Sequence, residues 1–337
     1  MFCDYLIYSS AMLTTDNIAD WFWVMRNHAG PKLVTGRRGI GKSKQLTMFA
    51  ERLLAAGVPQ KEIIVLDGES PQAYRLLSCK QIVEFIIGSS RNMETCHVLI
   101  REGDLLPDIG TVLGTLDAMP RFNVFVTASS RHMITAGLAD YLGNRLAYCE
   151  CLPPILDEPS ADIRRIWREA LLYDVHTPVR QPLNAQILNA LACHLSDSTG
   201  DPLSLRSIAA AISPGGNLLS PHTIDSYLTA LSDAHLIARC QRYDLAEECV
   251  LKSQYRCYFT SPAFRTELFG PAPSNEARRA RLNAAWLKLS HESDAVFAAS
   301  SAPEHVDFVT RQGSCYRLWH VHEDGITEIS RASFVAG

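Results

Sequence analysis

The chain has 337 residues, a length that predicts two or three domains. Hydrophobic residues make up 47% of it and charged residues 20%, which is typical of a globular protein with a large core and excludes a disordered chain. The formal net charge of −4 indicates neither a nucleic-acid partner nor an anionic membrane, although it is compatible with a local basic patch.

Cysteine usage and the N-terminal sequence indicate the compartment. The ten cysteines are scattered, without a Cys-x-x-Cys pair or the Cys/His spacing of a zinc site. The first residues lack the basic segment of a secretory signal, and no apolar run is long enough to span a bilayer. We therefore expect a protein of the reducing cytoplasm that has no membrane partner.

The first predicted elements lead into a glycine-rich stretch. Apolar side chains at helical spacing predict a helix over 18–25, and the sequence 33–35 is typical of the end of a short strand. Helical spacing returns over 46–54, and Gly57 suits the end of that helix. The glycine-rich stretch 36–43 therefore lies between a strand and a helix.

This stretch fits the phosphate-binding pattern G-x-x-x-x-G-K-[ST]. Its glycines let the backbone wrap a phosphate, Lys42 can reach the β- and γ-phosphates, and the Ser43 hydroxyl can bind Mg²⁺. The alternative, a surface turn beside a solvated lysine, does not account for the strand–loop–helix order. We predict that ATP and Mg²⁺ are bound by the loop and the residue after it: Gly36, Arg37, Arg38, Gly39, Ile40, Gly41, Lys42, Ser43 and Lys44.

Strand and helix patterns alternate after the loop. Strands are predicted over 62–67, 97–100, 123–130 and 146–152, and helices over 81–87 and 109–116. The continuous apolar run 62–67 is typical of a strand that is covered on both faces. The alternation predicts an α/β fold with a parallel sheet and helices on both faces, and with the loop at the carboxyl edge, where such sheets bind ligands.

Arg101 and Glu102 follow the strand 97–100. In this class of site the strand ends in an acid for Mg²⁺, often followed by a glutamate that orients the attacking water. Arg101 takes the place of the metal acid, whereas Glu102 fits the water-orienting position. A cation there would repel Mg²⁺ unless its side chain points away, and Asp104 or Asp67 could replace the acid. We predict nucleotide binding with slow or lost hydrolysis.

Four segments together resemble one family: 35–43, 63–67, 126–130 and Leu142-Gly143-Asn144-Arg145. Over nearly its whole length the chain is similar to prokaryotic AAA-type ATPases that carry a C-terminal domain of unknown function. The resemblance implies a P-loop NTPase domain over 1–155. A helical and winged-helix domain over 156–265 and a small α+β module over 266–337 would follow it.

The resemblance also implies roles for individual residues. Thr127 or Ser129 would sense the γ-phosphate, and Arg145 would act on the nucleotide or across a subunit interface. The alternatives are that the two hydroxyls cap the turn after the strand and that Arg145 forms a surface salt bridge. Glu102, Ser129 and Arg145 are therefore the candidate catalytic residues.

The region 156–265 combines helices with a strand pair. Helices are predicted over 162–175, 183–191, 204–212 and 220–231, and strands over 236–240 and 255–259. The last three helices and the strand pair describe a winged helix, which also matches the family's segment after the ATPase domain. The exposed face of the helix that begins at Pro221 has no lysine or arginine. This favours a protein-interaction or interdomain role over DNA binding.

The tail is predicted to hold a helix over 275–289 and strands over 295–298, 306–309 and 316–321. It resembles a restriction-endonuclease-like core in which Asp307 is kept, but His320-Val321-His322 stands where Glu-Val-Lys is expected. Asp307 with two histidines could bind a transition metal, yet a fold kept for packing is favoured. We expect no nuclease activity.

The leading hypothesis is an ATP-binding protein of the AAA-type P-loop class. Its nucleotide state would control the winged-helix region through Arg145 and the Pro153-Pro154 junction. A non-catalytic, nucleotide-gated protein-interaction module and a DNA-binding regulator are the alternatives. A phosphotransferase is disfavoured, because no acceptor-binding lid or catalytic base for a second substrate is evident.

Overall fold

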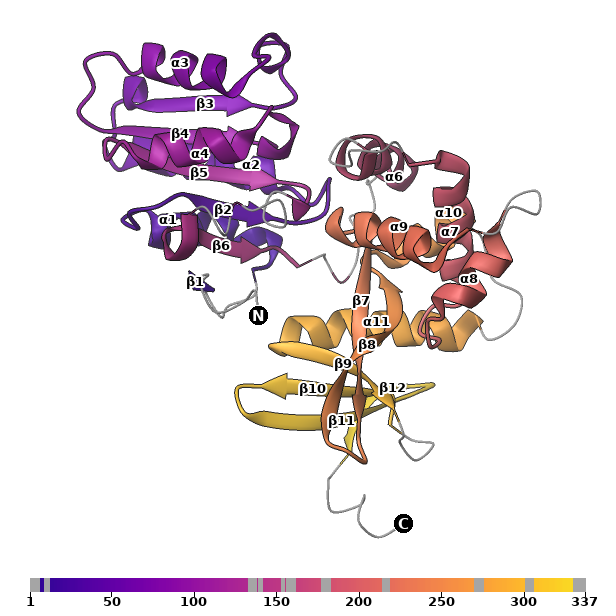
Figure 1. Ribbon diagram of the computed structural model, residues 1–337. Coiled ribbons are helices and arrows are strands. Elements are labelled where there is room, and N and C mark those ends of the chain that lie inside the picture. The colour runs from indigo at the N-terminus through magenta and orange to yellow at the C-terminus, as the bar shows by residue number, and fades with distance from the viewer. Residues whose placement is uncertain are drawn as a thin grey trace. The chain divides into compact units, whose positions relative to one another are not determined.

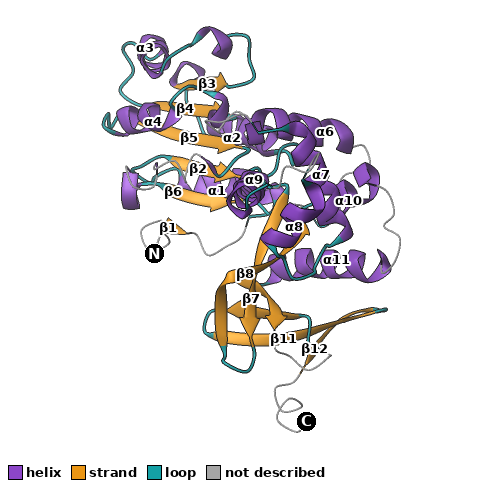
Figure 2. Cartoon of the chain, turned by 45° about the vertical axis from the view of Figure 1, so that its right-hand side comes forward, coloured by secondary structure: helices purple, strands orange, loops and turns teal. Residues whose placement is uncertain are grey.

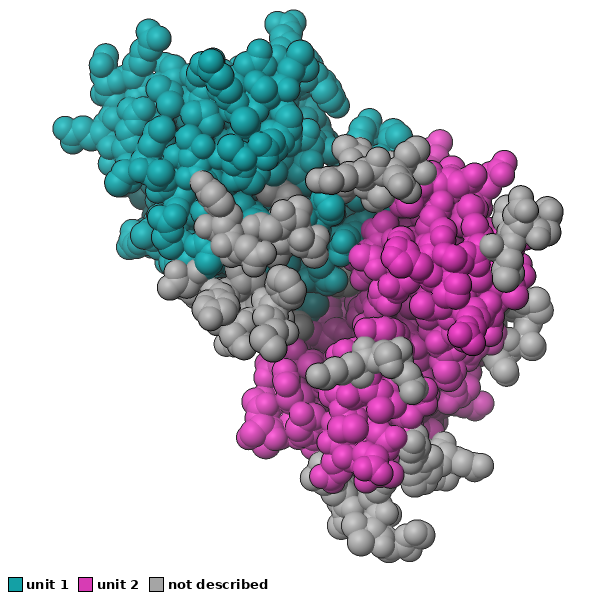
Figure 3. Space-filling model, viewed as in Figure 1, with its two compact units in different colours: residues 1–153, 169–178, 233–235 teal, residues 154–168, 179–232, 236–337 magenta. Residues whose placement is uncertain are grey.

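The computed structural model describes residues 7–8, 13–132, 138, 142–152, 155, 162–176, 183–213, 219–269, 276–300 and 306–329. The chain divides into two compact units, which Figure 3 shows in different colours. Unit 1 comprises 1–153, 169–178 and 233–235, and unit 2 comprises 154–168, 179–232 and 236–337. The first division lies close to the expected boundary at 155, but two short segments from further along the chain belong to unit 1.

Unit 1 is built on a parallel sheet in the order β1-β6-β2-β5-β4-β3 (Figure 1). Its strands are β1 (Ile7–Tyr8), β2 (Lys32–Thr35), β3 (Ile63–Asp67), β4 (Cys96–Arg101), β5 (Phe122–Ala128) and β6 (Ala147–Glu150). The predicted parallel α/β sheet is confirmed, and the short strand β1 was not predicted.

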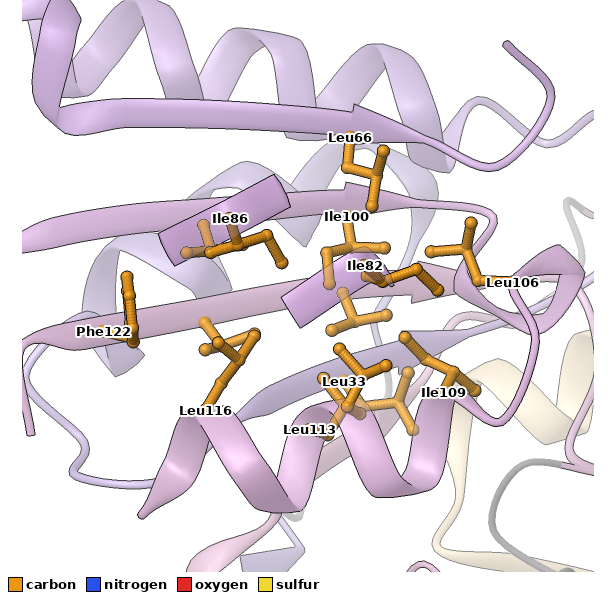
Figure 4. Packing of buried hydrophobic residues seen from close by; sticks show 14 of the residues in the cluster. Leu33, Leu66, Ile82, Ile86, Ile100, Leu106, Ile109, Leu113, Leu116 and Phe122 are labelled. Carbon is orange, nitrogen blue, oxygen red and sulfur yellow. The ribbon is translucent and has the colours of Figure 1, made fainter. Parts of the chain in front are cut away.

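Helices cover both faces of this sheet, as predicted. They are α1 (Ile18–Met25), α2 (Lys42–Ala55), α3 (Cys79–Ser89) and α4 (Ile109–Asp117). Successive strand residues point to opposite faces. Val34, Leu99 and Phe125 therefore pack with α1 and α2. Their neighbours Leu33, Val98, Ile100, Val124 and Val126 pack with α3 and α4. Figure 4 labels Leu33 and Ile100 of this cluster beside Ile82 of α3 and Leu113 of α4.

The strand β3 differs from its prediction. It lies at the edge of the sheet, and the Val65 side chain is 43% exposed. Ile64 and Leu66 are buried, whereas Ile63 on the other face is only partly buried against the cluster of α1 and α2. The apolar run predicts burial on both faces. However, β-branched residues such as Ile63 and Val65 are common in strands whether or not both faces are covered.

The segment 233–235 is attached to unit 1 at the end of the sheet. The backbone N–H of Arg131 donates to the Asp233 carbonyl at 2.8 Å. His235 Nδ1 lies 3.4 Å from Glu150 Oε1, and Arg131 Nε donates to Glu150 Oε2 at 2.8 Å. His235 is 4% exposed, so these contacts are internal to unit 1.

Unit 2 begins with helices that largely follow the sequence prediction. They are α6 (Ile163–Glu169), α7 (Ala185–Asp197), α8 (Leu205–Ile212), α9 (Pro221–Asp233), α10 (Pro262–Phe269) and α11 (Glu276–Glu292). The helix predicted over 162–175 is α6 followed by a π-helix, η7 (Ala170–His176), whose residues belong to unit 1. Ser220 caps α9, because its Oγ accepts the Thr223 N–H at 3.0 Å.

A second sheet in unit 2 has the order β12-β11-β10-β9-β7-β8. Figure 2 shows its strands in orange, with β7, β8, β11 and β12 labelled. Its strands are β7 (Ile237–Asp244), β8 (Cys249–Phe259), β9 (Ala295–Ser300), β10 (Phe308–Gln312), β11 (Cys315–His322) and β12 (Gly325–Ile329). The hairpin β7–β8 joins the tail because β7 pairs in parallel with β9. Helix α11 packs on this sheet, where Trp286 stacks on Tyr258 with a centroid distance of 5.6 Å.

The strands of this sheet come from both sides of the domain boundary expected at residue 265. The helical region and the tail were predicted as separate modules, whereas they share a sheet and a core within one compact unit. The three helices and hairpin of a winged helix are present in the expected order, and the winged-helix assignment stays a prediction. Pro153 and Pro154 lie outside the described residues. Among the helices that the structure describes, none is both long and apolar enough to cross a bilayer.

Candidate functional site

The predicted phosphate-binding loop connects β2 to α2 at the carboxyl edge of the sheet. Gly39 has φ of 80° and Gly41 of 97°, a left-handed conformation that glycine adopts without strain. A Cβ on Gly36 would lie 2.9 Å from the Cys151 carbonyl oxygen, so the loop also approaches β6 closely. Because α2 begins at Lys42, its first N–H groups and positive dipole end lie at the loop.

Lys42 is folded back onto the loop. Its Nζ donates to the carbonyl oxygens of Gly36 at 2.8 Å and Arg37 at 3.1 Å, and to Ser129 Oγ at 3.0 Å. The residue is 2% exposed. The ammonium group therefore lies inside the loop and is bonded to protein oxygens, whose place phosphate oxygens could take.

Glu102 connects the loop to the end of β5. Its Oε1 accepts a hydrogen bond from Ser43 Oγ at 3.2 Å, and its Oε2 accepts one from Ser129 Oγ at 2.6 Å. Burial disfavours the charge, but nearby Lys42 and Arg38 and the two hydroxyls hold the pKa of Glu102 below its usual range. Ser43, Glu102 and Ser129 thus form one hydrogen-bonded group.

Arg101 points away from this group. Its Nη2 donates to Thr47 Oγ1 at 2.5 Å, and its Nη1 lies 3.4 Å from Asp67 Oδ2. The charge of Arg101 is therefore paired with the acid at the end of β3. Asp67 is therefore engaged with Arg101. The carboxylate that accepts a hydrogen bond from Ser43 is that of Glu102.

Asp104 also reaches the site. Its Oδ2 accepts the Ser129 N–H at 3.1 Å, and within the described residues its buried Oδ1 has no hydrogen-bond partner. Burial, together with the nearby carboxylates of Glu102 and Asp174, raises the pKa of Asp104 to about 8. Asp104 lies beside Ser129, so it is a second acid of the site.

Ser129, of the two expected sensors, is the residue that contacts Lys42 and Glu102. The Thr127 hydroxyl is buried in β5, and it makes no hydrogen bond to any residue that the structure describes. Thr127 lies within β5, whereas Ser129 follows Ala128, the last residue of the strand, and so lies in the turn at the carboxyl end of the sheet.

Arg145 lies at the end of the sheet opposite the phosphate-binding loop. A Cβ on Gly30, just before β2, would lie 1.7 Å from the Arg145 carbonyl oxygen, whereas the loop follows the opposite end of β2. Arg145 Nη2 lies 2.7 Å from Asp117 Oδ2, and its side chain is 55% exposed. Arg145 thus forms an ion pair, with an Asp117 side chain that is 2% exposed, and this contact does not bring Arg145 to the loop of its own chain.

The remaining loop residues divide by exposure. Arg37, Arg38 and Ile40 are buried, whereas Lys44 is exposed on α2. Arg38 contacts Asp174 of the π-helix, a residue that sequence reasoning missed. No local signal could have identified it, because one acid within an amphipathic helix is normally solvated.

Residues 28–158 match the family model described as the AAA domain. This range contains β2 to β6 and the loop just described. Unit 1 therefore contains a region similar to the AAA domain, which is called the AAA domain below. The match implies that the AAA domain binds a nucleotide, in agreement with the loop geometry.

Similar proteins were found for longer parts of the chain. An uncharacterized protein of Haemophilus influenzae is 20% identical over 342 residues, which cover 90% of this chain and 85% of that protein. A Drosophila ORC structure, bound to DNA, is 12% identical with a TM-score of 0.29, covering 41% of this chain and 89% of the other. A DNA polymerase III gamma subunit-related protein of Thermotoga maritima is 11% identical with a TM-score of 0.31, covering 82% and 86%. TM-scores this low do not establish a common fold.

The predicted site of the tail is occupied by internal contacts. Asp307 is buried; its Oδ1 accepts from Arg278 Nη2 at 2.8 Å, and its Oδ2 lies 3.0 Å from His320 Nδ1. His322 Nε2 is instead 2.6 Å from Thr327 Oγ1. In the described parts of the chain, no group of three or more His, Cys, Asp or Glu residues could hold a metal ion.

The arginines of the hairpin β7–β8 are bound within unit 2. Arg239 Nη2 donates to Asp225 Oδ1 of α9 at 2.7 Å, and Arg256 Nη2 donates to the Ala299 carbonyl at 3.0 Å. Arg242 Nη2 donates to Ser300 Oγ at 2.5 Å. These contacts reduce the charge that the hairpin could offer to a phosphate backbone.

Proposed function

We propose that the AAA domain binds ATP with Mg²⁺ at the loop 36–43 and hydrolyses it slowly or not at all. The nucleotide state would control unit 2, including its predicted winged-helix region. The observation that carries this proposal is the hydrogen-bonded group of Ser43, Glu102 and Ser129 beside Lys42.

The donor set suits a magnesium-bound triphosphate. Lys42 and the loop amides would hold the phosphates, Ser43 would bind the metal ion through its hydroxyl, and Glu102 would orient a water molecule. Ser129 would contact the γ-phosphate. Magnesium, when bound, supplies positive charge that stabilises the oxygens of the transferred phosphoryl group.

Slow hydrolysis follows from the end of β4. The metal acid expected there is replaced by Arg101, whose guanidinium is paired with Asp67. Glu102 is shared between Ser43 and Ser129, and its φ of 43° places it in the sparsely populated left-handed region. The second acid, Asp104, has a pKa of about 8 and is mostly protonated at neutral pH, so the Glu102 carboxylate would have to serve both the metal and the water positions.

Nucleotide affinity, measured by titration calorimetry with and without Mg²⁺, tests the proposal. The wild type should bind ATP more tightly with Mg²⁺, and Lys42→Ala should weaken binding by about tenfold or more, since a charge-assisted contact contributes about 1.5–3 kcal/mol. Lys61→Ala is the matched control, because Lys61 is exposed and lies outside the predicted binding residues. Equal binding by Lys42→Ala and the wild type would contradict the site, and rapid Lys42-dependent phosphate release would contradict slow turnover.

Arg101 also favours a second candidate, a nucleotide-gated interaction module without turnover. Phosphate release separates the two, because a gated module binds ATP and releases no phosphate above the Lys42→Ala background. A DNA-binding regulator is less favoured, since the hairpin arginines are engaged internally. Duplex DNA binding at low salt, weakened by added salt, would support that alternative.

A further inference from the structure

Arg38, in the middle of the phosphate-binding loop, is held by carboxylates. Its Nε donates to Asp174 Oδ2 at 2.9 Å and its Nη2 to Asp174 Oδ1 at 2.7 Å, so the pair is bidentate. Nη1 donates to Glu69, and Nη2 lies 3.8 Å from Glu102 Oε2. Arg38 is therefore fully engaged while the loop is closed around Lys42.

Asp174 reaches the loop from the π-helix η7. The residue before it, Tyr173, places its ring centroid 5.3 Å from the Arg38 guanidinium carbon, a cation–π distance. Asp174 is 2% exposed, and the bidentate contact with Arg38 compensates its charge. π-helices are rare and occur frequently at functional sites. These contacts hold η7 on the loop.

A bound triphosphate would compete for the same guanidinium. The planar fork of arginine binds phosphate as well as carboxylate, and Arg38 belongs to the loop that would surround the phosphates. A buried carboxylate that loses its partner is strongly destabilised. Burial already raises the pKa of Asp174 to about 6 despite Arg38, so the site tolerates its charge poorly. Asp174 would therefore leave when Arg38 turns to phosphate.

We propose that a bound nucleoside triphosphate takes the Arg38 guanidinium from Asp174 and thereby releases the π-helix Ala170–His176 from the loop. This regulation rests on the proposed function, because it requires a triphosphate at the loop. Helix α6 precedes η7 directly in the chain and, except for its last residue, belongs to unit 2, so the release would act on the covalent connection between the units.

Hydrogen–deuterium exchange of the full-length protein tests the release without any substitution. The amides of 170–176 should exchange slowly in the nucleotide-free protein and several-fold faster with saturating Mg²⁺ and adenylyl imidodiphosphate. The loop 36–43 should become more protected in the same experiment, which reports binding independently. Loop protection with unchanged exchange over 170–176 would overturn the release and leave the proposed function intact.

The variant Asp174→Asn tests the competition directly. It should show fast exchange over 170–176 without nucleotide and bind the analogue more tightly, by about tenfold for each 1.4 kcal/mol of competition removed. Glu51→Gln, an exposed acid on α2, is the matched control and should leave both quantities unchanged. Weaker or equal binding by folded Asp174→Asn would contradict the competition. If neither protein binds the analogue, both the release and the proposed function are wrong.

Discussion

Lys32 illustrates how this fold accommodates a charged side chain in the middle of its sheet. It lies on β2 and is fully buried, with Nζ donating to the His28 carbonyl at 2.5 Å and to Asn123 Oδ1 at 2.6 Å. The Phe125 ring lies 5.0 Å from the same nitrogen. Burial lowers the pKa of Lys32 to about 8.

This pKa predicts a pH dependence of stability. Below pH 8 the folded protein bears the cost of a buried charge, and between pH 8 and 10.5 the unfolded chain binds more protons than the folded one. The free energy of unfolding should therefore rise in that window, by at most about 1.4 kcal/mol per pH unit, relative to Lys32→Met. Urea unfolding from pH 7 to 10 measures this difference. Parallel pH curves for the two proteins would contradict it, and Lys44→Met, at an exposed position, should behave as the wild type.

Residues of the site differ in how well the sequence predicts them. The loop and Ser43 follow from a pattern that is local, and Glu102 and Ser129 follow from their places at strand ends. Asp174 could not be predicted, because its role depends on Arg38, which is 136 positions away in the chain. The direction of Arg101 was also open, since side-chain orientation at a strand end depends on its neighbours Thr47 and Asp67.

The turn after β3 determines where Glu102 lies. A Cβ on Gly68 would be 2.3 Å from the Glu102 carbonyl oxygen, closer than any side chain allows, and 3.2 Å from Leu105 Cβ. The Gly68 N–H also donates to the Arg101 carbonyl at 2.9 Å. The end of β4 is therefore positioned by backbone contact with the neighbouring strand.

A pair of glycine variants tests this positioning. Gly68→Ala should displace Glu102, lower the unfolding temperature and weaken Mg²⁺-dependent nucleotide binding. Gly88→Ala, in α3 with no atom within 4 Å of the added Cβ, should instead stabilise the protein by about 0.5–1 kcal/mol. Thermal unfolding and nucleotide titration measure both effects. Wild-type stability and affinity in Gly68→Ala would show that the turn tolerates a side chain.

Helices were predicted more reliably than strand neighbours. The apolar stripes of α1, α2 and α9 are visible in the sequence because helical periodicity is a local property. The edge position of β3 was missed, since an apolar run does not reveal how many neighbours a strand has. The change from α6 to the π-helix η7 was missed for a related reason, because both helices continue one apolar pattern.

The second sheet joins the helical region and the tail, which the sequence predicts as separate modules. Tyr258 of β8 is fully buried against Trp286 of α11 and Phe308 of β10. Cys240 of β7 lies in the same cluster. The paired strands β7 and β9 are some fifty residues apart in the chain, and the amino-acid composition near the expected boundary at residue 265 does not indicate that they pair. The helical region and the tail are therefore expected to unfold together.

Truncation at the expected boundary tests this expectation. A chain that ends at residue 265 should lose the cooperative unfolding of unit 2 and aggregate, because Cys240 and Tyr258 lose their cover from α11, β9 and β10. Nucleotide binding by the AAA domain should persist in the soluble fraction. Calorimetry of the two chains, with light scattering, measures these outcomes. A soluble truncated chain with an unchanged second transition would favour separate modules.

The attachment of Asp233–His235 to Arg131 and Glu150 bears on how the protein is made. The N-terminal unit lacks this contact until residue 235 has left the ribosome, although its sheet is complete at Glu150. At synthesis rates of about 5–20 residues per second, the interval lasts roughly 4 to 17 s. During that time Arg131 and Glu150 of the nascent sheet lack Asp233 and His235 as partners, so this contact forms only after the sheet has been synthesised.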